Sequence, residues 1–249
     1  MITGKDTKLR IHLSPRDREK FGIISARAEE ITPENLDEVF SFCRREKAGL
    51  LIARCRTTEL GAAQALEKNG AILTDTLVVY LRNLVRTPIP EVSGKYLIRE
   101  IRPGEEEAVR AVAEEAFRDY RGHYGADRRL EGVKSGEIYS SWAGRAARER
   151  DDTHGVILAE KNGEVAGFAL VRISRPGEGE GTLEGVSPRA GRRSLIQRDM
   201  AIGGMNWTRQ RGAKRLLASV SLNNVVMQKI VIRLGYEPFL SYHTFHLWL

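Results

Sequence analysis

One stretch, residues 182–236, limits most strongly what this chain can fold into. Its predicted elements are, in chain order, a strand at 182–186, a basic loop at 187–193, a helix at 194–211, a strand at 215–220 and a helix at 226–234. Ser194 and Gln197 have the Ser-x-x-Gln spacing of a capping box, which predicts the start of the first helix. Gly212 stands just past its end, where glycine is favoured. The layout brings a loop and the start of a long helix to one point.

The loop and the helix start have the composition of an anion site. The first backbone N–H groups of a helix and the positive end of its dipole attract negative charge. Guanidinium groups pair well with phosphate, and four arginines lie in this region, Arg189, Arg192, Arg193 and Arg198. The sequence therefore predicts a site that suits a diphosphate. The alternative is that these arginines only form a solvated surface.

The order of the elements resembles the acetyl-CoA-binding core of the GNAT N-acyltransferases. That family has a strand ending in Val-x-Pro, a pyrophosphate loop and a long helix, followed by a strand, an Asn-led helix and a Gly-Phe-Glu-Pro-like turn. The matching residues, within about 95–249, are Val186-Ser187-Pro188, Gly212-Ala213, Asn224 and Leu234-Gly235-Tyr236-Glu237-Pro238. The resemblance implies an α/β fold, with a central mixed twisted sheet and flanking helices, and acetyl-CoA as co-substrate with no metal. The cofactor-binding residues that it implies are Val186, Gly191, Arg192, Arg193, Ser194 and Asn224.

Two features depart from the family pattern. Only one of the expected loop glycines is clear. The tyrosine that acts as general acid in many members falls seven residues after Asn224, where this chain has Val231, which cannot donate a proton. Either another residue protonates the departing thiolate, with Tyr242, His243 and His246 as the candidates, or the chain binds acyl-CoA without catalysing transfer.

Glu184 lies on the strand that leads into the loop. Acyl transfer to an amine needs the amine neutral, so a base or a water-mediated proton path helps. In many GNAT enzymes a glutamate on this strand does that work, which makes Glu184 a catalytic candidate by resemblance. Strand alternation puts it on the same face as Val186. The alternative is a strand carboxylate that faces solvent or an arginine.

Residues 119–130 form a polar, aromatic and glycine-containing stretch before a predicted helix. Loops of this composition tend to carry binding groups. It resembles the His-Tyr-x-x-Asp-x-x-Leu … Tyr-x-x-Trp pattern of amino-sugar acyltransferases such as the dTDP-fucosamine acetyltransferases. By resemblance, Tyr124, Asp127, Tyr139 and Trp142 line the acceptor pocket. His123 is the second catalytic candidate, because imidazole titrates near neutral pH. The alternative for Tyr139 and Trp142, which share one helix face, is a position in the core.

The residues before this core predict a smaller α/β domain at 1–88, joined by a proline-containing linker to an acyltransferase domain at 95–249. Residues 66–80 resemble the end of the N-terminal domain in dTDP-fucosamine acetyltransferase-like proteins, which implies a truncated half-copy of the GNAT fold. The alternative, which we prefer for these residues, is a helix–strand scaffold.

Three further elements belong to the second domain. Asn162-Gly163 predicts a hairpin turn, whereas the Pro-Gly-Glu-Gly-Glu-Gly run at 176–181 predicts a flexible acidic connection. Residues 241–249 are predicted to be the last strand. On a strand His243 and His246 face opposite sides, which argues against a metal pair.

The composition is that of a soluble globular protein. Lys and Arg number 40 against 33 Asp and Glu, a net charge of +7 that suits anionic small molecules. No recognised nucleic-acid motif accompanies this charge, so nucleic acid is not the expected partner. Cys43 and Cys55 make neither a disulfide framework nor a zinc site. No apolar run approaches the ~20 residues of a membrane span, and the first residues lack the apolar region of a signal peptide. We therefore expect a cytoplasmic protein with no membrane partner, in which pairing of edge strands would give a homodimer.

These observations predict an acetyl-CoA-dependent N-acetyltransferase that acts on a primary amine by direct transfer. A nucleotide-linked amino sugar is the acceptor that the resemblance suggests. The alternative is a non-catalytic acyl-CoA-binding or regulatory GNAT-like module. A third class, a basic nucleic-acid binder, predicts affinity that falls steeply with salt.

Overall fold

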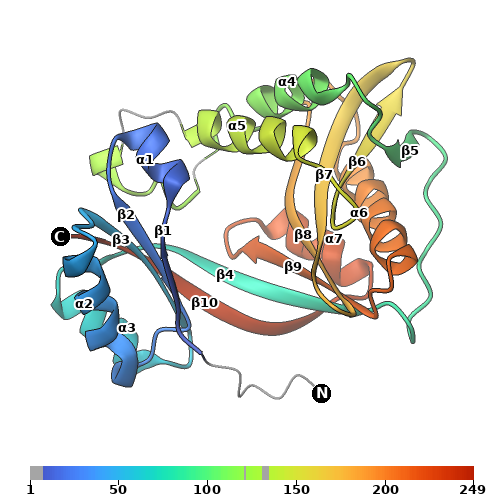
Figure 1. The fold of residues 1–249 in the computed structure, drawn as a ribbon. Helices are drawn as coiled ribbons and strands as arrows, with labels where there is room; N and C mark the ends of the chain where they lie inside the picture. The colour runs from blue at the N-terminus through green and yellow to red at the C-terminus, as the bar shows by residue number, and fades with distance from the viewer. Residues whose placement is uncertain (1–7, 121, 131–134) are drawn as a thin grey trace. The chain divides into compact units, whose positions relative to one another are not determined.

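The computed structural model describes residues 8–120, 122–130 and 135–249 (Figure 1). They form two compact units, each assembled from separate stretches of the chain. Unit 1 contains Met1–Leu77, Arg121–Val133 and Leu240–Leu249, and unit 2 contains Val78–Tyr120 and Lys134–Phe239. The two contiguous domains at 1–88 and 95–249 stay a prediction.

Unit 1 is built on a sheet with the strand order β1-β2-β3-β10-β4. Strands β2 and β3 are parallel, whereas β1–β2 and β3–β10 are antiparallel. The elements are β1 (Arg10–Leu13), α1 (Pro15–Phe21), β2 (Ser25–Glu29), η1 (Pro33–Asn35), α2 (Leu36–Arg45), β3 (Leu50–Arg56), α3 (Leu60–Lys68), β4 (Ile72–Asn83), η2 (Arg128–Leu130) and β10 (Glu237–Trp248). Residues of β4 and β10 also fall in unit 2.

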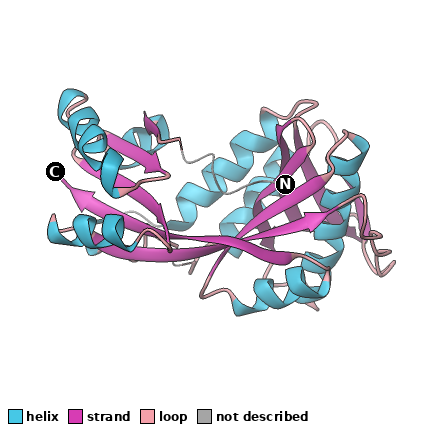
Figure 2. Cartoon of the chain, turned by 90° about the horizontal axis from the view of Figure 1, so that it is seen from below, coloured by secondary structure: helices cyan, strands magenta, loops and turns pink. Residues whose placement is uncertain are grey.

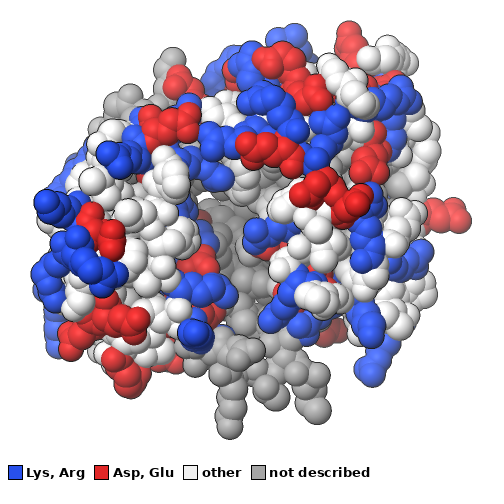
Figure 3. Space-filling view, in the orientation of Figure 1, with Lys and Arg blue, Asp and Glu red and all other residues white. Residues whose placement is uncertain are grey.

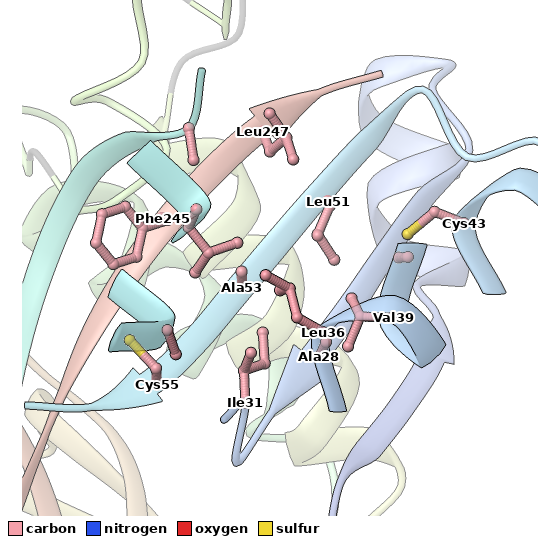
Figure 4. Close-up of a cluster of buried hydrophobic side chains, with 14 of the residues drawn as sticks. Ala28, Ile31, Leu36, Val39, Cys43, Leu51, Ala53, Cys55, Phe245 and Leu247 are labelled. Atoms are coloured by element: carbon pink, nitrogen blue, oxygen red, sulfur yellow. The ribbon is translucent and has the colours of Figure 1, made fainter. Parts of the chain in front are cut away.

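The two sides of the unit 1 sheet differ in polarity, because successive strand residues face opposite ways. On the apolar side, Leu51, Phe245 and Leu247 pack with side chains of α2 and α3 into a buried core (Figure 4). On the polar side, Arg54 of β3 lies directly opposite Thr244 of β10. This core covers one side of the sheet, whereas the other side combines polar side chains with the buried Leu50 and Ile52.

Unit 2 has the strand order β4-β9-β8-β7-β6-β5. Neighbours from β5 to β8 are antiparallel, whereas β8 and β9 are parallel. The remaining elements are β5 (Leu97–Glu100), α4 (Glu106–Ala116), α5 (Ser135–Arg148), β6 (His154–Lys161), β7 (Glu164–Arg175), β8 (Glu178–Val186), α6 (Arg193–Gln210), β9 (Arg215–Ser221) and α7 (Val225–Arg233).

Helices cover both faces of the unit 2 sheet. Leu158 of β6 packs with side chains of α4 and α5 in one core, whereas its neighbour Ile157 packs with α6 in another. Figure 2 shows helices on either side of these strands. A sheet with flanking helices is the layered α/β class that the sequence predicts, and the prediction is confirmed.

Most predicted helices and strands are present, with their ends shifted by a few residues. The hairpin is confirmed, because Asn162 and Gly163 both have positive φ angles, 54° and 81°, between β6 and β7. Gly212 likewise has a φ of 82° just past α6, a left-handed conformation that glycine adopts at little cost. Asn224 begins α7 as predicted, since its side chain accepts a hydrogen bond from the Met227 N–H.

Two local predictions are wrong. Ser194 and Gln197 form no capping box, because the chain enters α6 through Arg192 in a left-handed conformation and no side chain caps the helix. The acidic run at 176–181 is not a flexible connection, because β8 already begins at Glu178. Glu178 is buried and pairs with Arg175 at 2.9 Å and with an arginine of β9 at 2.7 Å. One local and one long-range ion pair thus hold Glu178 in the sheet.

The surface carries both signs of charge. On the face shown in Figure 3, Lys and Arg side chains are interspersed with Asp and Glu. Such a mixture lacks the one-signed stripe that is typical of nucleic-acid binders. No helix in the described ranges, 8–120, 122–130 and 135–249, is long and apolar enough to cross a membrane.

Candidate functional site

Strands β8 and β9 separate part-way along their length. Their parallel register ends where Gly181 lies opposite Ala218, whereas β8 continues to Val186 and β9 to Ser221. Beyond this pair of residues, β8 and β9 are no longer paired with each other in the described sheet. Ligands of open α/β sheets bind outside the carboxyl ends of parallel strands. Helix α6 connects these two strands, so its first turn stands at the same end.

The loop between β8 and α6 is held in place by other parts of unit 2. The Tyr96 hydroxyl donates to the Gly191 carbonyl oxygen at 2.8 Å. Glu115 of α4 accepts from the Ser187 hydroxyl at 2.8 Å and pairs with Arg189 at 2.6 Å. These contacts fix the loop at both ends, which lowers the entropy that a ligand would have to overcome on binding.

The start of α6 is exposed and positively charged. Arg192 adopts a φ of 57° and the helix begins at Arg193, and the first N–H groups of any helix have no partner within it. In the described part of the chain, neither guanidinium has an ion-pair partner. A Cβ added to Gly191 would meet no atom within 4 Å, so a ligand can approach the loop closely. The prediction of an anion site thus has a physical basis in the unpaired charges and N–H groups.

A cavity of about 230 Å³ adjoins this helix start, between α6 and α7. Its lining residues are Ser194, Leu195, Arg198, Ile230, Arg233 and Leu234. Arg198 is already engaged, with Asp199 at 2.6 Å and with a backbone carbonyl oxygen at 3.0 Å. The wall therefore combines apolar side chains with basic groups, which suits a ligand that has both anionic and apolar parts.

Glu184 lies on the part of β8 that extends beyond the pairing with β9. Its Oε1 is buried and has no hydrogen-bond partner among the described residues. Burial raises the pKa of this carboxyl from an ordinary value of 4.5 to about 8. Burial also raises the pKa of the Tyr236 hydroxyl, and the charge of Glu184 adds to that rise, so the two side chains are near each other. A carboxyl group with this pKa can exchange protons near neutral pH.

Position 231 offers no proton donor. Val231 is 1% exposed and belongs to the apolar core around α7. The three candidates for a replacement acid, Tyr242, His243 and His246, all belong to unit 1. There Tyr242 donates to Glu30, His243 contacts the Thr76 hydroxyl at 3.1 Å, and His246 contacts a buried carboxylate.

The residues predicted to bind or activate the acceptor fall in both units. His123, Tyr124 and Asp127 belong to unit 1 and are buried there. Tyr139 and Trp142 belong to α5 in unit 2, half-buried against the core under α4 and α5. The Tyr139 ring stacks on Phe117 with centroids 5.1 Å apart. The roles of all five in acceptor binding and catalysis stay a prediction, as do those of the predicted cofactor-binding residues.

No group of three or more His, Cys, Asp or Glu side chains in the ranges that the structure describes could hold a metal ion. Cys43 and Cys55 are separate, buried thiols. His243 and His246 lie on opposite sides of β10, as strand alternation predicts. The site in unit 2 consists of a helix start, a loop and a carboxyl group.

Comparison with known proteins identifies the fold. No family model matches the chain, and a search of curated proteins found no match. Among solved structures, the chain is similar to a GCN5-related N-acetyltransferase from Sphaerobacter thermophilus, with a TM-score of 0.61 and 18% sequence identity over 96% of this chain and 76% of that one. The fold is that of the GCN5-related N-acetyltransferases.

Two other structures with this fold are informative. A tandem GNAT protein from the clavulanic acid biosynthesis pathway has a TM-score of 0.56 and 14% identity, over 89% of this chain and 74% of that one. A GCN5-related glucosamine N-acetyltransferase region of a fungal multi-domain GH3 β-N-acetylglucosaminidase has a TM-score of 0.56 and 14% identity, over 96% of this chain and 31% of that one. At these identities the likeness to the GNAT structures concerns the fold alone.

Several contacts of the site in unit 2 have no signal in the sequence. Tyr96 reaches the loop from 95 residues away, and Glu115 does so from a helix on which acidic residues are common. Arg233 reads as an ordinary basic residue in the last turn of a helix. Only the packing of α4, α6 and α7 on the sheet brings these groups together.

Proposed function

We propose that the protein is an acetyl-CoA-dependent N-acetyltransferase that acts on a primary amine by direct transfer. One observation carries the proposal: a basic helix start without ion pairs and a carboxyl group with a buried, unpaired oxygen occur together at the separated ends of β8 and β9. Such an enzyme needs a place for a diphosphate and a base for the amine, and unit 2 has candidates for both. The GNAT fold supports the proposal.

The helix start is the proposed diphosphate site. Arg192 and Arg193 supply charge without first having to break an ion pair, and the N–H groups of Gly191 and Ser194 supply neutral donors. The adjoining cavity, with its apolar walls and basic rim, takes a neighbouring part of CoA. The free strand edge near Val186 orients the acetyl carbonyl, where a backbone N–H can stabilise negative charge on its oxygen. Asn224 contributes at the start of α7.

Glu184 is the proposed general base. The amine nitrogen attacks the thioester carbon while Glu184 accepts the ammonium proton, directly or through one water. The carbon–sulfur bond then breaks, the acetyl group stays on nitrogen, and the electron pair leaves with sulfur. A thiol has an ordinary pKa near 8.5, so the thiolate can depart and take its proton from water near pH 8. Val231 is compatible with this route, which needs no tyrosine.

The proposed acceptor is an amino sugar, linked to a nucleotide. The His123-to-Trp142 pattern that resembles amino-sugar acyltransferases supports it, and so does the likeness in fold to a region described as a glucosamine N-acetyltransferase. His123, Tyr124, Asp127, Tyr139 and Trp142 remain the proposed acceptor-side residues. Other primary amines are alternatives that the assay below separates.

Val231 favours a second candidate, a non-catalytic acyl-CoA-binding module. Valine cannot donate a proton, and it stands where many GNAT enzymes have the tyrosine that protonates the thiolate. A module of this kind would bind acetyl-CoA through the helix start but release no CoA with any amine.

Calorimetric titration with acetyl-CoA tests the binding step. Arg192→Ala/Arg193→Ala should abolish micromolar binding, because two charge-assisted contacts to phosphate are lost. Arg44→Ala/Arg45→Ala, on α2, removes the same net charge and should leave binding unchanged. If the wild type binds neither acetyl-CoA nor longer acyl-CoAs, the transferase proposal is wrong.

Release of CoA tests catalysis, with glucosamine, nucleotide-linked amino sugars and simple primary amines as acceptors. Glu184→Gln should retain acetyl-CoA binding and lower turnover about 10²–10⁴-fold, the usual contribution of a general base. Binding by the wild type without turnover of any amine would instead establish the non-catalytic module.

A further inference from the structure

The cavity between α6 and α7 has an uneven set of charges. Ser194 in the first turn of α6 and Arg233 in the last turn of α7 both line it, and so does Arg198, which lies further along α6. None of the described residues that line the cavity has a carboxylate, and the remaining ones are apolar. A cavity of this kind suits an anionic group that is attached to a framework with apolar surface.

The charge of Arg198 is already neutralised. Its Nη1 lies 2.6 Å from Asp199 Oδ1, and its Nη2 donates to the Glu91 carbonyl oxygen at 3.0 Å. Asp199 is 0% exposed, and its second oxygen accepts from the Ser93 N–H at 3.1 Å and from the Ser93 hydroxyl. A phosphate that took Arg198 as its partner would leave this buried carboxylate without its counter-charge, which is costly. Arg198 therefore shapes the wall of the cavity and supplies no free charge.

Arg233, in contrast, keeps its charge. It is exposed in the last turn of α7, and within the described ranges its guanidinium has neither an ion pair nor a hydrogen bond. The cavity thus has two guanidiniums against the single carboxylate of Asp199, an excess of one positive charge. The alternative is that Arg233 only interacts with the negative end of its own helix, as basic residues in a last turn often do.

The negative end of α7 is already compensated by other groups. The N–H groups that follow the helix donate to two carbonyl oxygens of its last turn at 2.9 and 3.0 Å, and Gly235 has a φ of 77°. These are the bonds and the backbone of a Schellman motif. Arg82, which is 1% exposed and has no ion pair in the described part of the chain, donates to the Leu234 carbonyl oxygen. A positive charge therefore already stands at this helix end, and Arg233 is left for a ligand.

The position of the cavity indicates the ligand. Ser194 belongs both to this cavity and to the proposed diphosphate site, so a group in the cavity lies next to the diphosphate. In CoA that group is a ribose with a phosphate on its 3′ oxygen and adenine on its 1′ carbon. The phosphate matches the excess positive charge, and the carbon atoms of the nucleoside match the apolar wall. A volume of about 230 Å³ is that of a site for part of a ligand rather than for a whole CoA molecule.

We propose that Arg233 binds the 3′-phosphate of CoA and thereby determines which donors the protein accepts. Acetyl-CoA has this phosphate, whereas acetyl-dephospho-CoA and an acetyl-phosphopantetheine group on a carrier protein lack it. Leu195 and Ile230 contact the nucleoside, and Arg198, held by Asp199, keeps the wall in place. The inference rests on the proposed function, because it assigns a further part of the same CoA ligand.

Calorimetric titration of the full-length protein with acetyl-CoA and with acetyl-dephospho-CoA tests the proposal. The wild type should bind acetyl-CoA about 10–100-fold more tightly, as expected for hydrogen bonds between charged groups. Arg233→Ala should weaken acetyl-CoA binding by about this factor and leave acetyl-dephospho-CoA binding unchanged, so that the ratio of the two affinities falls to about one. Arg233→Lys keeps the charge and should retain part of the preference.

Arg209→Ala is the matched control. Arg209 is also exposed in the last turn of a unit 2 helix, with no ion pair among the described residues. Its replacement removes the same charge and the same interaction with a helix end, and it should leave both affinities unchanged. Acetyl-dephospho-CoA is at the same time a check on folding, since a variant that binds it normally has an intact diphosphate site. Equal weakening of both donors by Arg233→Lys would overturn the proposal.

The outcomes for the wild type separate this inference from the proposed function. If it binds acetyl-CoA and acetyl-dephospho-CoA equally well, Arg233 does not recognise the 3′-phosphate, and the proposed function stands without this inference. If it binds neither, the proposed function is wrong and the inference is wrong with it. NADP⁺ has its additional phosphate on the 2′ oxygen of the same ribose. Tighter binding of NADP⁺ than of acetyl-CoA would assign the cavity to another cofactor and would also overturn the proposal.

Discussion

Replacement of Glu184 by glutamine should change how the stability of this protein depends on pH. The folded carboxyl group has a pKa of about 8 because burial disfavours its charge, whereas the same group in the unfolded chain ionises near 4.5. Between these values the unfolded chain binds fewer protons than the folded one. The free energy of unfolding therefore falls as pH rises through this window. Glutamine has nearly the same shape but does not titrate.

The size of the effect follows from the two pKa values. Each pH unit is worth about 1.36 kcal/mol, so the difference of about 3.5 units between 4.5 and 8 corresponds to about 5 kcal/mol above pH 8. At pH 7 the expected difference is about 3 kcal/mol, or roughly 6–12 °C in Tm for a chain of this length. Glu184→Gln should match the wild type near pH 4.5 and become the more stable protein as pH rises.

Urea unfolding and thermal scans at a series of pH values from 4.5 to 9 would measure this difference. Glu164→Gln, at an exposed position of β7, is the control and should follow the wild type throughout. The difference between variants isolates Glu184, because the other titrating groups are common to both. Parallel curves for the wild type and Glu184→Gln would refute the reasoning, since they would show that the carboxyl group is not buried without a partner.

Three further outcomes are expected. Gly235→Ala should destabilise the protein by more than about 1 kcal/mol in urea unfolding, since Gly235 has a φ of 77° and an added Cβ would collide with the Arg82 guanidinium. Unchanged stability would contradict the left-handed backbone and the close approach there. Cys43 and Cys55 should react with a thiol reagent only on unfolding, because burial raises the pKa of each to about 11, and rapid labelling of the native protein would disprove this. Tyr96→Phe should weaken acetyl-CoA binding about 2–10-fold with little change in Tm, since one hydrogen bond to the loop is lost; equal affinity would mean that the loop needs no such anchor.

Elements with strong local signals could be predicted from the sequence alone. The turn at Asn162-Gly163 and the end of α6 at Gly212 depend on left-handed backbone that few other residues adopt easily. Asn224 caps α7 with its own side chain. In each case the deciding interaction lies within a few residues, so the pattern and the structure agree.

Elements decided by distant partners could not be predicted in this way. The run around Glu178 has the composition of a linker, but Arg215 of β9, 37 residues further along the chain, pairs with Glu178, and the run is part of a strand. The start of α6 depends on how the loop is anchored by Tyr96 and Glu115, which no local pattern reveals.

The candidate site shows the same division. Glu184 could be singled out by its place on a strand before the basic loop. The raised pKa of Glu184 could not be predicted from the sequence. It depends on where the pairing of β8 and β9 ends and on the absence of a hydrogen-bond partner among the described residues. The hydrogen-bond chain from Asp127 through His246 to His123 joins residues more than 100 positions apart, so the sequence alone left His246 as one of three candidates.

Strand β10 lies between β3 and β4 in the sheet of unit 1, although its residues are translated last of all the strands. The exposed edge of β3 therefore emerges from the ribosome about 180 residues before the strand that covers it. At a synthesis rate of about 5–20 residues per second, this edge of β3 stays unpaired for roughly 10–40 s before β10 is made. An unpaired strand edge invites pairing with other chains. Synthesis, rather than the finished fold, is the stage at which this protein is most exposed to aggregation, and the stage at which a chaperone would help it most.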